Sequence, residues 1–158
     1  MRILKLSLVF IGLTFSAACS SDSDTLKDEE KPTLSLAYEG GFPQGCAVLN
    51  RGETYTFKAQ LTDNEALAAY SLELHHNFDH HTHDDQAAVC ELGPLKEAVN
   101  PFIYRENFKL EDRPKAYEIN IQVTIPDDID TGDYHCGFSV TDATGWQRRT
   151  SVDIKIVE

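Results

Sequence analysis

Positive charge and sulfur ligands are both scarce in this sequence. It has 14 lysines and arginines against 26 aspartates and glutamates, which gives a formal net charge of −12 at pH 7. Nucleic-acid binding depends on basic side chains that neutralise phosphates, so this balance argues against a nucleic-acid partner, whereas it suits the attraction of cations. The single methionine is Met1, which excludes a methionine-rich copper(I) site.

A long apolar run is missing as well. The apolar segment from Leu6 to Phe15 is shorter than the roughly 20 residues that a helix needs to cross a bilayer core. It follows Arg2 and Lys5, and small residues at positions 16–18 end it. This order of a positive region, an apolar region and small residues is typical of a cleaved signal peptide over residues 1–18.

Cys19 comes directly after the small residues, an arrangement that resembles a bacterial lipobox. The resemblance implies that Cys19 is lipidated and becomes the first mature residue; ordinary secretory cleavage after Ala18 is the alternative. Residues 19–31 are acidic with one large apolar residue, so we expect a flexible tether. An acidic segment after a lipidated cysteine resembles the surface-export signals of Bacteroidetes lipoproteins. That implies an outer-membrane anchor at the cell surface, with the periplasmic face as the alternative location.

Cysteine is rare in the mature chain, because only Cys46, Cys90 and Cys136 remain after Cys19. An oxidising compartment permits one disulfide among them, and the sequence leaves its pairing open. The unpaired cysteine is either a free thiol or a thiolate ligand. Loss of Arg2 and Lys5 with the signal peptide changes the formal charge from −12 to −14.

Residues 32–158 form one predicted domain without sustained helical periodicity, apart from a short helix that residues 94–99 could form. Apolar residues alternate with polar ones in short segments that glycine, proline and aspartate separate. About seven such segments predict an all-β domain, an antiparallel β-sandwich. The predicted strands are Thr33–Tyr38, Thr54–Leu61, Ala69–Asn77, Pro101–Leu110, Tyr117–Ile125, Asp133–Thr141 and Arg148–Val157.

The segment from Asp130 to Cys136 resembles the start of strand F in immunoglobulin domains. That resemblance implies a tyrosine corner at Tyr134, whose hydroxyl would bond back to the backbone. The predicted strand Thr54–Leu61 lacks the cysteine of those domains, and Ala69–Asn77 lacks their tryptophan. We therefore expect an immunoglobulin-like β-sandwich without the usual disulfide between its sheets.

Five of the six histidines lie between Leu74 and Asp85, interleaved with three aspartates. Imidazole is the commonest transition-metal ligand among side chains, and nearby carboxylates bind the metal or orient the rings. A short histidine-rich tract therefore predicts a metal site, and a solvated polar loop is the alternative. The histidines are His75, His76, His80, His81 and His83, and the aspartates are Asp79, Asp84 and Asp85.

Strand register brings the sixth histidine to the same place. In an immunoglobulin-like sheet Ala69–Asn77 and Asp133–Thr141 are neighbours, and alternation points His75 and His135 to the outer face. Cross-strand Cβ atoms are about 4.5–5.5 Å apart, which suits two imidazoles on one ion. We predict a metal site of His75, His81, His83 and His135, with Asp79 as an orienting group or fifth ligand and with His76 and His80 on the wrong side.

The stretch from His75 to His83, together with residues 132–135 and the turn at Gly145 and Trp146, resembles a family of small, histidine-rich Bacteroidetes lipoproteins with an immunoglobulin-like domain. This is domain of unknown function family 4625, and the resemblance covers most of residues 32–158. It implies lipidation and a shared group of histidines, but it brings no established activity.

These features predict a cell-envelope lipoprotein that binds a divalent transition metal, zinc before copper, for capture or transfer. Its expected partners are the membrane, through the lipid anchor, the metal ion and, as a candidate, an outer-membrane transporter. Binding should weaken below about pH 6, because the ligands must be neutral and imidazole has a pKa of about 6.5.

An enzyme and an adhesion module are the alternatives. Glu73 shares the outer face with His75 and could act as a base beside a metal-bound water. However, the sequence has no HExxH helix or nucleophile motif, and a site on an outer sheet face is open to water, so we expect no catalysis. An adhesion or interaction module would carry the histidine loop as a structural or incidental feature.

A calcium site in the acidic cluster near residue 130 is a weaker hypothesis. The spacing of these residues matches no calcium-loop motif, so a solvated turn is favoured there. The residues are Asp127, Asp128, Asp130 and Asp133.

Overall fold

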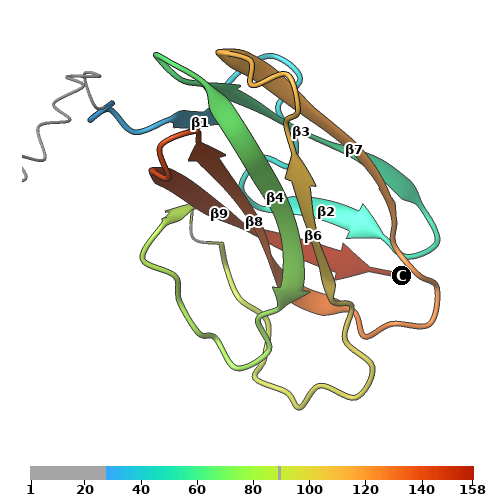
Figure 1. Ribbon diagram of the computed structural model, residues 1–158. Coiled ribbons are helices and arrows are strands. Elements are labelled where there is room, and N and C mark those ends of the chain that lie inside the picture. The colour runs from blue at the N-terminus through green and yellow to red at the C-terminus, as the bar shows by residue number, and fades with distance from the viewer. Residues whose placement is uncertain (1–27, 89) are drawn as a thin grey trace, which may run out of the picture.

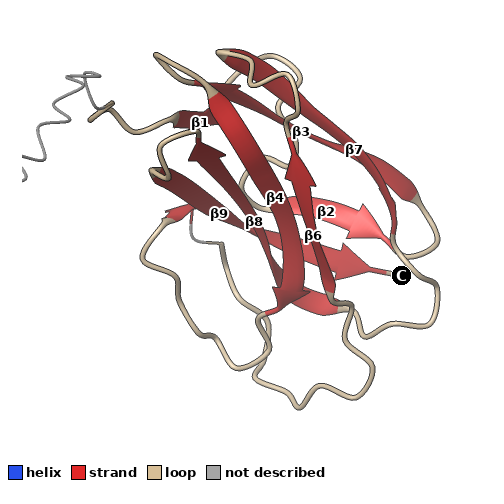
Figure 2. Ribbon diagram, viewed as in Figure 1, coloured by secondary structure: helices blue, strands red, loops and turns tan. Residues whose placement is uncertain are grey.

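The structure, a computed structural model, describes residues 28–88 and 90–158. These residues form nine strands and no helix (Figure 2), so this part of the chain holds no helix that could span a membrane. The predicted signal peptide, Cys19 and most of the predicted tether lie outside the described residues. The strands are β1 (Thr33–Ser35), β2 (Ala47–Asn50), β3 (Thr54–Thr62), β4 (Leu67–His76), β5 (Gln86–Ala88), β6 (Tyr104–Lys109), β7 (Ala116–Thr124), β8 (Gly132–Asp142) and β9 (Gln147–Val157).

The strands form two sheets that pack face to face (Figure 1). One sheet has the order β1-β3-β7, and the other has the order β2-β9-β8-β4-β6 with β5 beside β9. Apolar residues at alternate positions meet between the sheets, because every second side chain of a strand points to the same face. Examples of these buried residues are Phe57, Leu72, Tyr134 and Ile154. The predicted all-β sandwich is therefore confirmed.

Two strands were not predicted, and they make the larger sheet mixed rather than wholly antiparallel. β2 and β5 both pair in parallel with β9. Each has only three or four residues, too few for a recognisable alternation. The structure also corrects the short helix expected over residues 94–99, since that segment has no regular secondary structure. Aspartate side chains hold its ends: Gly93 N–H donates to Asp133 Oδ2 and Val99 N–H to Asp130 Oδ2.

The tyrosine corner forms as the sequence predicts. Tyr134 donates its hydroxyl hydrogen to the backbone oxygen of Asp130 at 2.5 Å and accepts from the N–H of Phe102 at 3.2 Å. β8 runs between β4 and β9 in the larger sheet. Its register places His135 opposite His75 on one side and opposite Asp153 on the other. These three residues therefore form one row across the outer face of three strands.

A disulfide joins Cys46 to Cys90. Both cysteines contact β9 at Asp153: the N–H of Cys46 donates to its backbone oxygen and the N–H of Cys90 to its Oδ2. The disulfide therefore fixes the end of the histidine-rich segment to the sheet. Cys136 is free and buried in the core, where burial raises the pKa of its thiol well above the usual value. It points away from the histidines, which removes it as a thiolate ligand.

Candidate metal centre

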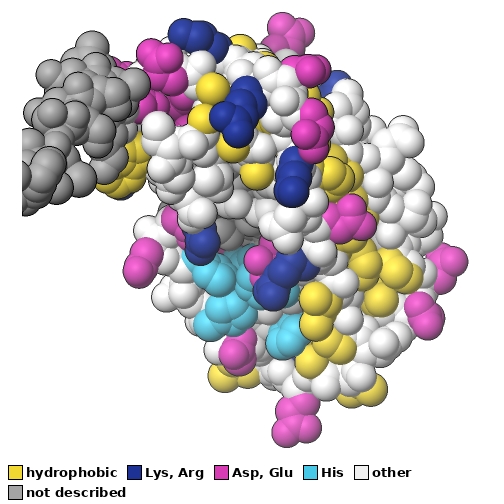
Figure 3. All heavy atoms as spheres, viewed as in Figure 1, with side chains coloured by type: hydrophobic (Ala, Val, Ile, Leu, Met, Phe, Trp, Pro, Cys, Tyr) yellow, Lys and Arg dark blue, Asp and Glu magenta, His cyan; other side chains and the backbone are white. Residues whose placement is uncertain are grey.

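The histidine-rich segment leaves β4 and folds back over the outer face of the larger sheet. Phe78 anchors it, since this ring is buried and lies edge-on to Tyr134 at 5.3 Å between ring centroids. The main chain of Gly132 lies close beside Phe78. With the loop held in this way, the histidines gather in one patch on the surface (Figure 3).

Four histidines converge in this patch, and they are the four that the sequence grouped. One ring nitrogen each of His75, His81, His83 and His135 lies within 4.8 Å of the others. His75 Nε2 is 3.2 Å from His81 Nε2 and 3.1 Å from His83 Nε2. In a tetrahedral zinc site with Zn–N distances of about 2.0–2.1 Å, two ligand nitrogens are about 3.3–3.4 Å apart. These two distances are close to the value that one tetrahedral ion requires, and all four ring nitrogens lie near enough to face a single ion.

The opposite ring nitrogen of three of these histidines faces a carboxylate. His81 Nδ1 is 2.6 Å from Asp79 Oδ1, and His75 Nδ1 is 3.3 Å from Glu73 Oε1. His135 Nδ1 is 2.8 Å from Asp153 Oδ1, with the ring N–H directed off the line between the two atoms. A carboxylate in this position favours the proton on Nδ1 and the use of Nε2 as the metal ligand. Nε2 of His135 lies 3.2 Å from the backbone oxygen of His81, a contact that metal binding would replace.

The electrostatics of the cluster favour neutral imidazoles. Burial is the main cause that lowers the pKa of His75 to about 4, and the neighbouring histidines add to the effect. Burial also lowers the pKa of His135. The neutral ring is the form that binds a metal. His135 is completely buried beneath the loop, whereas the other three histidines are partly exposed, so the loop shields only part of the site from water.

The remaining residues of the tract lie outside the cluster. His76 packs against Phe78 at 4.9 Å between ring centroids, and His80 takes a left-handed backbone conformation with φ of 58°. Asp79 lies behind the ring of His81, in the place of an orienting group rather than of a fifth ligand. The strand alternation that set His76 and His80 apart from the other histidines therefore agrees with their positions.

Sequence reasoning missed Asp153 and gave Glu73 a different role. Alternation within β9 places Asp153 outward between Val152 and Ile154, but its position opposite His135 depends on the pairing of β8 with β9. Glu73 was considered as a base, whereas it contacts both His75 and Arg105. It therefore links the cluster to the neighbouring strand β6.

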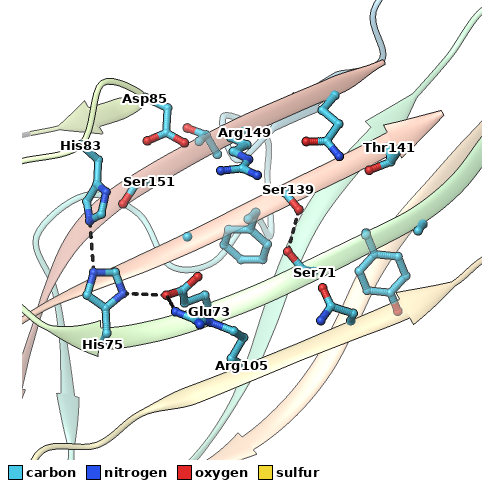
Figure 4. A pocket seen from close by; sticks show the side chains of 17 residues that line it. Ser71, Glu73, His75, His83, Asp85, Arg105, Ser139, Thr141, Arg149 and Ser151 are labelled. Atoms are coloured by element: carbon cyan, nitrogen blue, oxygen red, sulfur yellow. Dashed lines mark hydrogen bonds and ion pairs between the residues drawn. The ribbon is translucent and has the colours of Figure 1, made fainter. Parts of the chain in front are cut away.

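A groove of about 400 Å³ runs along the outer face and ends at the cluster (Figure 4). His75 and His83 lie at one end, beside the ion pair of Glu73 with Arg105. Further along, Ser71 and Ser139 share a hydrogen bond of 2.6 Å across β4 and β8. The groove therefore gives solvent a way to two of the four histidines.

Comparison with known proteins gives a family but no activity. A search of curated proteins finds no match. One family model matches residues 17–157, which is most of the chain, and it is described as a domain of unknown function, DUF4625. The protein therefore belongs to the DUF4625 family, as predicted from the stretch His75 to His83, residues 132–135 and the turn at Gly145 and Trp146.

Proposed function

We propose that this protein is a cell-envelope lipoprotein that binds a divalent transition metal through His75, His81, His83 and His135, for capture or transfer. The observation that carries the proposal is the geometry of the ring nitrogens. His75 Nε2 lies 3.1–3.2 Å from the Nε2 atoms of two other histidines. A hydrogen on one nitrogen can bridge only one such contact, whereas a metal ion satisfies all of them.

Zinc is the preferred ion. Imidazole suits zinc, copper(II) and nickel(II), but copper(II) and nickel(II) favour square-planar or tetragonal sites. The two separations of 3.1 and 3.2 Å from His75 Nε2 are close to the tetrahedral value and match zinc better. Four protein ligands also fill a tetrahedral ion and leave no position for a water or a substrate. We therefore propose binding rather than catalysis.

Capture or transfer is favoured because the four ligands are held by elements of different rigidity. His75 and His135 are fixed on neighbouring strands, whereas His81 and His83 lie on the loop. Movement of the loop would open the ion to the groove and to a partner. We propose that Cys19 carries the lipid, that the protein is anchored in the outer membrane at the cell surface, and that an outer-membrane transporter is the candidate recipient of the metal.

A structural role for the metal is the second candidate, and the complete burial of His135 favours it. In that case the ion would join the loop to the sheet, and the domain would serve as an interaction module. The two candidates differ in what metal removal does. A capture site leaves a folded sandwich behind, whereas loss of a structural ion unfolds the domain.

Metal content tests the proposal. The mature chain, with Cys19→Ser to prevent lipidation, is secreted to allow the disulfide and purified without a histidine tag. After loading with zinc and gel filtration, we expect close to one zinc per chain by mass spectrometry. The His81→Ala/His83→Ala variant should lose the zinc while its circular dichroism spectrum stays that of a folded β-protein.

The matched control changes the two histidines of the same tract that lie outside the cluster. His76→Gln/His80→Asn keeps polar side chains, and asparagine tolerates the left-handed backbone of residue 80. This variant should bind zinc as the parent does. No zinc, copper or nickel above background in the folded parent would exclude a transition-metal function, and equal loss in both variants would exclude the four-histidine site.

A further inference from the structure

A second cluster of potential ligands lies at the other end of the larger sheet from the histidines. Asp28 precedes β1, Asp63 follows β3, and Asp142 ends β8. One carboxylate oxygen of each lies within 4.8 Å of the others. These three aspartates are distant in sequence, and none belongs to the acidic group near residue 130.

Each carboxylate is fixed by hydrogen bonds to only one of its oxygens, Oδ1. Asp63 Oδ1 accepts from the N–H groups of residues 65 and 66 at 2.9 and 2.6 Å. Asp142 Oδ1 accepts from the N–H groups of residues 144, 145 and 146 at 2.7–2.9 Å. Asp28 Oδ1 accepts from the N–H of residue 30 and the amide of Asn64, both at 3.0 Å. The backbone turns therefore hold all three side chains in place.

The other oxygen of each carboxylate has no partner. Oδ2 of Asp28, Asp63 and Asp142 is buried and makes no hydrogen bond to the described residues. The exposed fractions of the three residues are only 9%, 9% and 2%. Within residues 28–88 and 90–158, no lysine or arginine forms an ion pair with any of them. Buried carboxylates are costly unless they are paired or bind a metal, so three neighbouring carboxylates that each have one unpaired oxygen favour a bound cation.

We propose that Asp28, Asp63 and Asp142 bind a calcium ion. Calcium takes oxygen ligands at about 2.3–2.6 Å, so two ligands of one ion are at most about 5 Å apart. The separation of the carboxylate oxygens, up to 4.8 Å, lies within this limit. Water and backbone carbonyls would complete the set of about six to eight ligands that calcium usually takes. Hard oxygen donors distinguish this site from the imidazole site, which prefers softer ions.

The ion would fix the point where the chain enters the domain. The backbone oxygen of Asp28 accepts a hydrogen bond from Trp146 Nε1 at 3.1 Å, and Lys31 lies over the ring of Trp146. Asp28 follows Cys19, the predicted lipidated residue, by nine positions. Calcium would therefore hold the segment next to the anchor against the turns at Asp63 and Asp142, and so orient the domain relative to the membrane.

The position of Trp146, the single tryptophan in the sequence, gives a direct assay. The mature chain with Cys19→Ser, in its zinc-loaded form, is titrated with calcium and magnesium. Terbium(III) serves as a luminescent probe that indole excites. We expect terbium luminescence on excitation of Trp146, its displacement by calcium, and a dissociation constant for calcium of about 10⁻³ M or tighter, as in extracellular modules. Magnesium should bind more weakly than calcium.

Two conservative variants test the ligands. Asp63→Asn and Asp142→Asn keep the oxygen that accepts the backbone hydrogen bonds but remove the charge. Calcium should raise the Tm of the parent protein, and each variant should abolish this rise. In the presence of a calcium chelator, Asp63→Asn should have a higher Tm than the parent, because repulsion among the three carboxylates is relieved. Asp128→Asn, which changes an exposed aspartate outside the cluster, should behave as the parent does.

The opposite pattern would overturn the proposal. It fails if the folded parent shows no calcium response at about ten times the upper dissociation constant, or if Asp63→Asn and Asp142→Asn keep the response. Magnesium binding as tight as calcium binding would reject the assignment of calcium. None of these results depends on the histidines, so His81→Ala/His83→Ala should retain the calcium response.

Discussion

At the scale of single residues, the proposed metal site depends on which nitrogen of each ring carries the proton. Asp153 faces Nδ1 of His135 at 2.8 Å, while its second oxygen accepts from Gln86 Nε2 and from the N–H of Cys90. In Asp153→Asn, the remaining oxygen would keep these two donors, and the new amide would donate to Nδ1 of His135. The proton of His135 would then lie on Nε2, where the backbone oxygen of His81 at 3.2 Å would accept it and the nitrogen could not bind a metal.

We therefore expect Asp153→Asn to lower zinc affinity by about 10–100-fold, the usual range for a group that orients a ligand. Titration against a competing chelator measures this change. Asp79→Asn is the comparison, because the Asp79 side chain is 68% exposed and its amide can turn toward water. The loss of zinc affinity in Asp79→Asn should be smaller than in Asp153→Asn. An unchanged zinc affinity in folded Asp153→Asn would show that Asp153 does not orient His135.

The low pKa of His75 predicts how the metal-free domain responds to acid. Burial lowers this pKa to about 4 in the folded protein, compared with about 6.5 in an unfolded chain. Between these values the unfolded state binds more protons, so stability is present above pH 6.5 and is lost as the pH falls toward 4. From pH 7 to pH 5 we expect His75 to account for about 2 kcal/mol, at about 1.4 kcal/mol per pKa unit.

Urea unfolding in the presence of a zinc chelator measures this effect. The free energy of unfolding at pH 7 and pH 5 is compared between the parent and His75→Gln, which cannot titrate. The parent should lose more stability than the variant. If both lose the same amount, burial does not keep His75 neutral in the metal-free protein.

The residues of the candidate site were predictable from the sequence because they depend on local periodicity. Alternation along two strands, together with their neighbouring positions in an immunoglobulin-like sheet, was sufficient to pair His75 with His135, and the same alternation set His76 aside. Asp153 was not predictable in the same way, since its place beside His135 arises from a strand pairing that carries no local signal. Asp28 was also missed, because its charge in an acidic segment resembles that of a solvated tether.

At the scale of elements, the loop that carries His81 and His83 is positioned by the close contact of Phe78 with β8. Gly132 makes this contact possible: its φ is 134°, and a Cβ atom there would lie 3.1 Å from Phe78 Cε1. Gly132→Ala would add backbone strain of about 1–3 kcal/mol and would displace Phe78. We expect it to reduce both the free energy of unfolding and the zinc affinity.

Gly40→Ala is the matched control for this prediction. Gly40 also has a positive φ, 100°, but a Cβ atom there would have no neighbour within 4 Å. It should therefore lose a similar amount of stability from backbone strain and keep its zinc affinity. Equal zinc affinity in the two variants would mean that the Phe78 contact does not position the loop.

The longer strands were predictable and the short ones were not, for a physical reason. β8 and β9 each contain 11 residues, so apolar residues recur at alternate positions several times along each of them. β2 and β5 are held by their pairing with β9 and by the disulfide between Cys46 and Cys90. Such strands depend on tertiary contacts, which the local sequence does not record.

At the scale of the whole molecule, β4 and β8 separate the two proposed metal sites. Leu67 lies opposite Asp142 at the beginning of β4, and His75 lies opposite His135 near its end. At about 3.3 Å per residue, eight residues of strand place these pairs about 26 Å apart. Figure 1 shows the chain entering the domain beside β1, at the end of the sandwich opposite the loop that follows β4. The start of the described chain and the proposed transition-metal site therefore lie at opposite ends of the sandwich.

This separation predicts that zinc and calcium stabilise the protein independently. Each ion, at about 100 times its dissociation constant, should raise the free energy of unfolding by about 2.7 kcal/mol. Sites this far apart, with no shared ligands, should be additive within about 0.5 kcal/mol. Denaturant unfolding of the mature Cys19→Ser chain without metal, with each ion and with both measures the four values. A combined gain close to that of one ion alone would mean that zinc and calcium compete for a single site, and a gain well above the sum would mean that binding at one end orders the other.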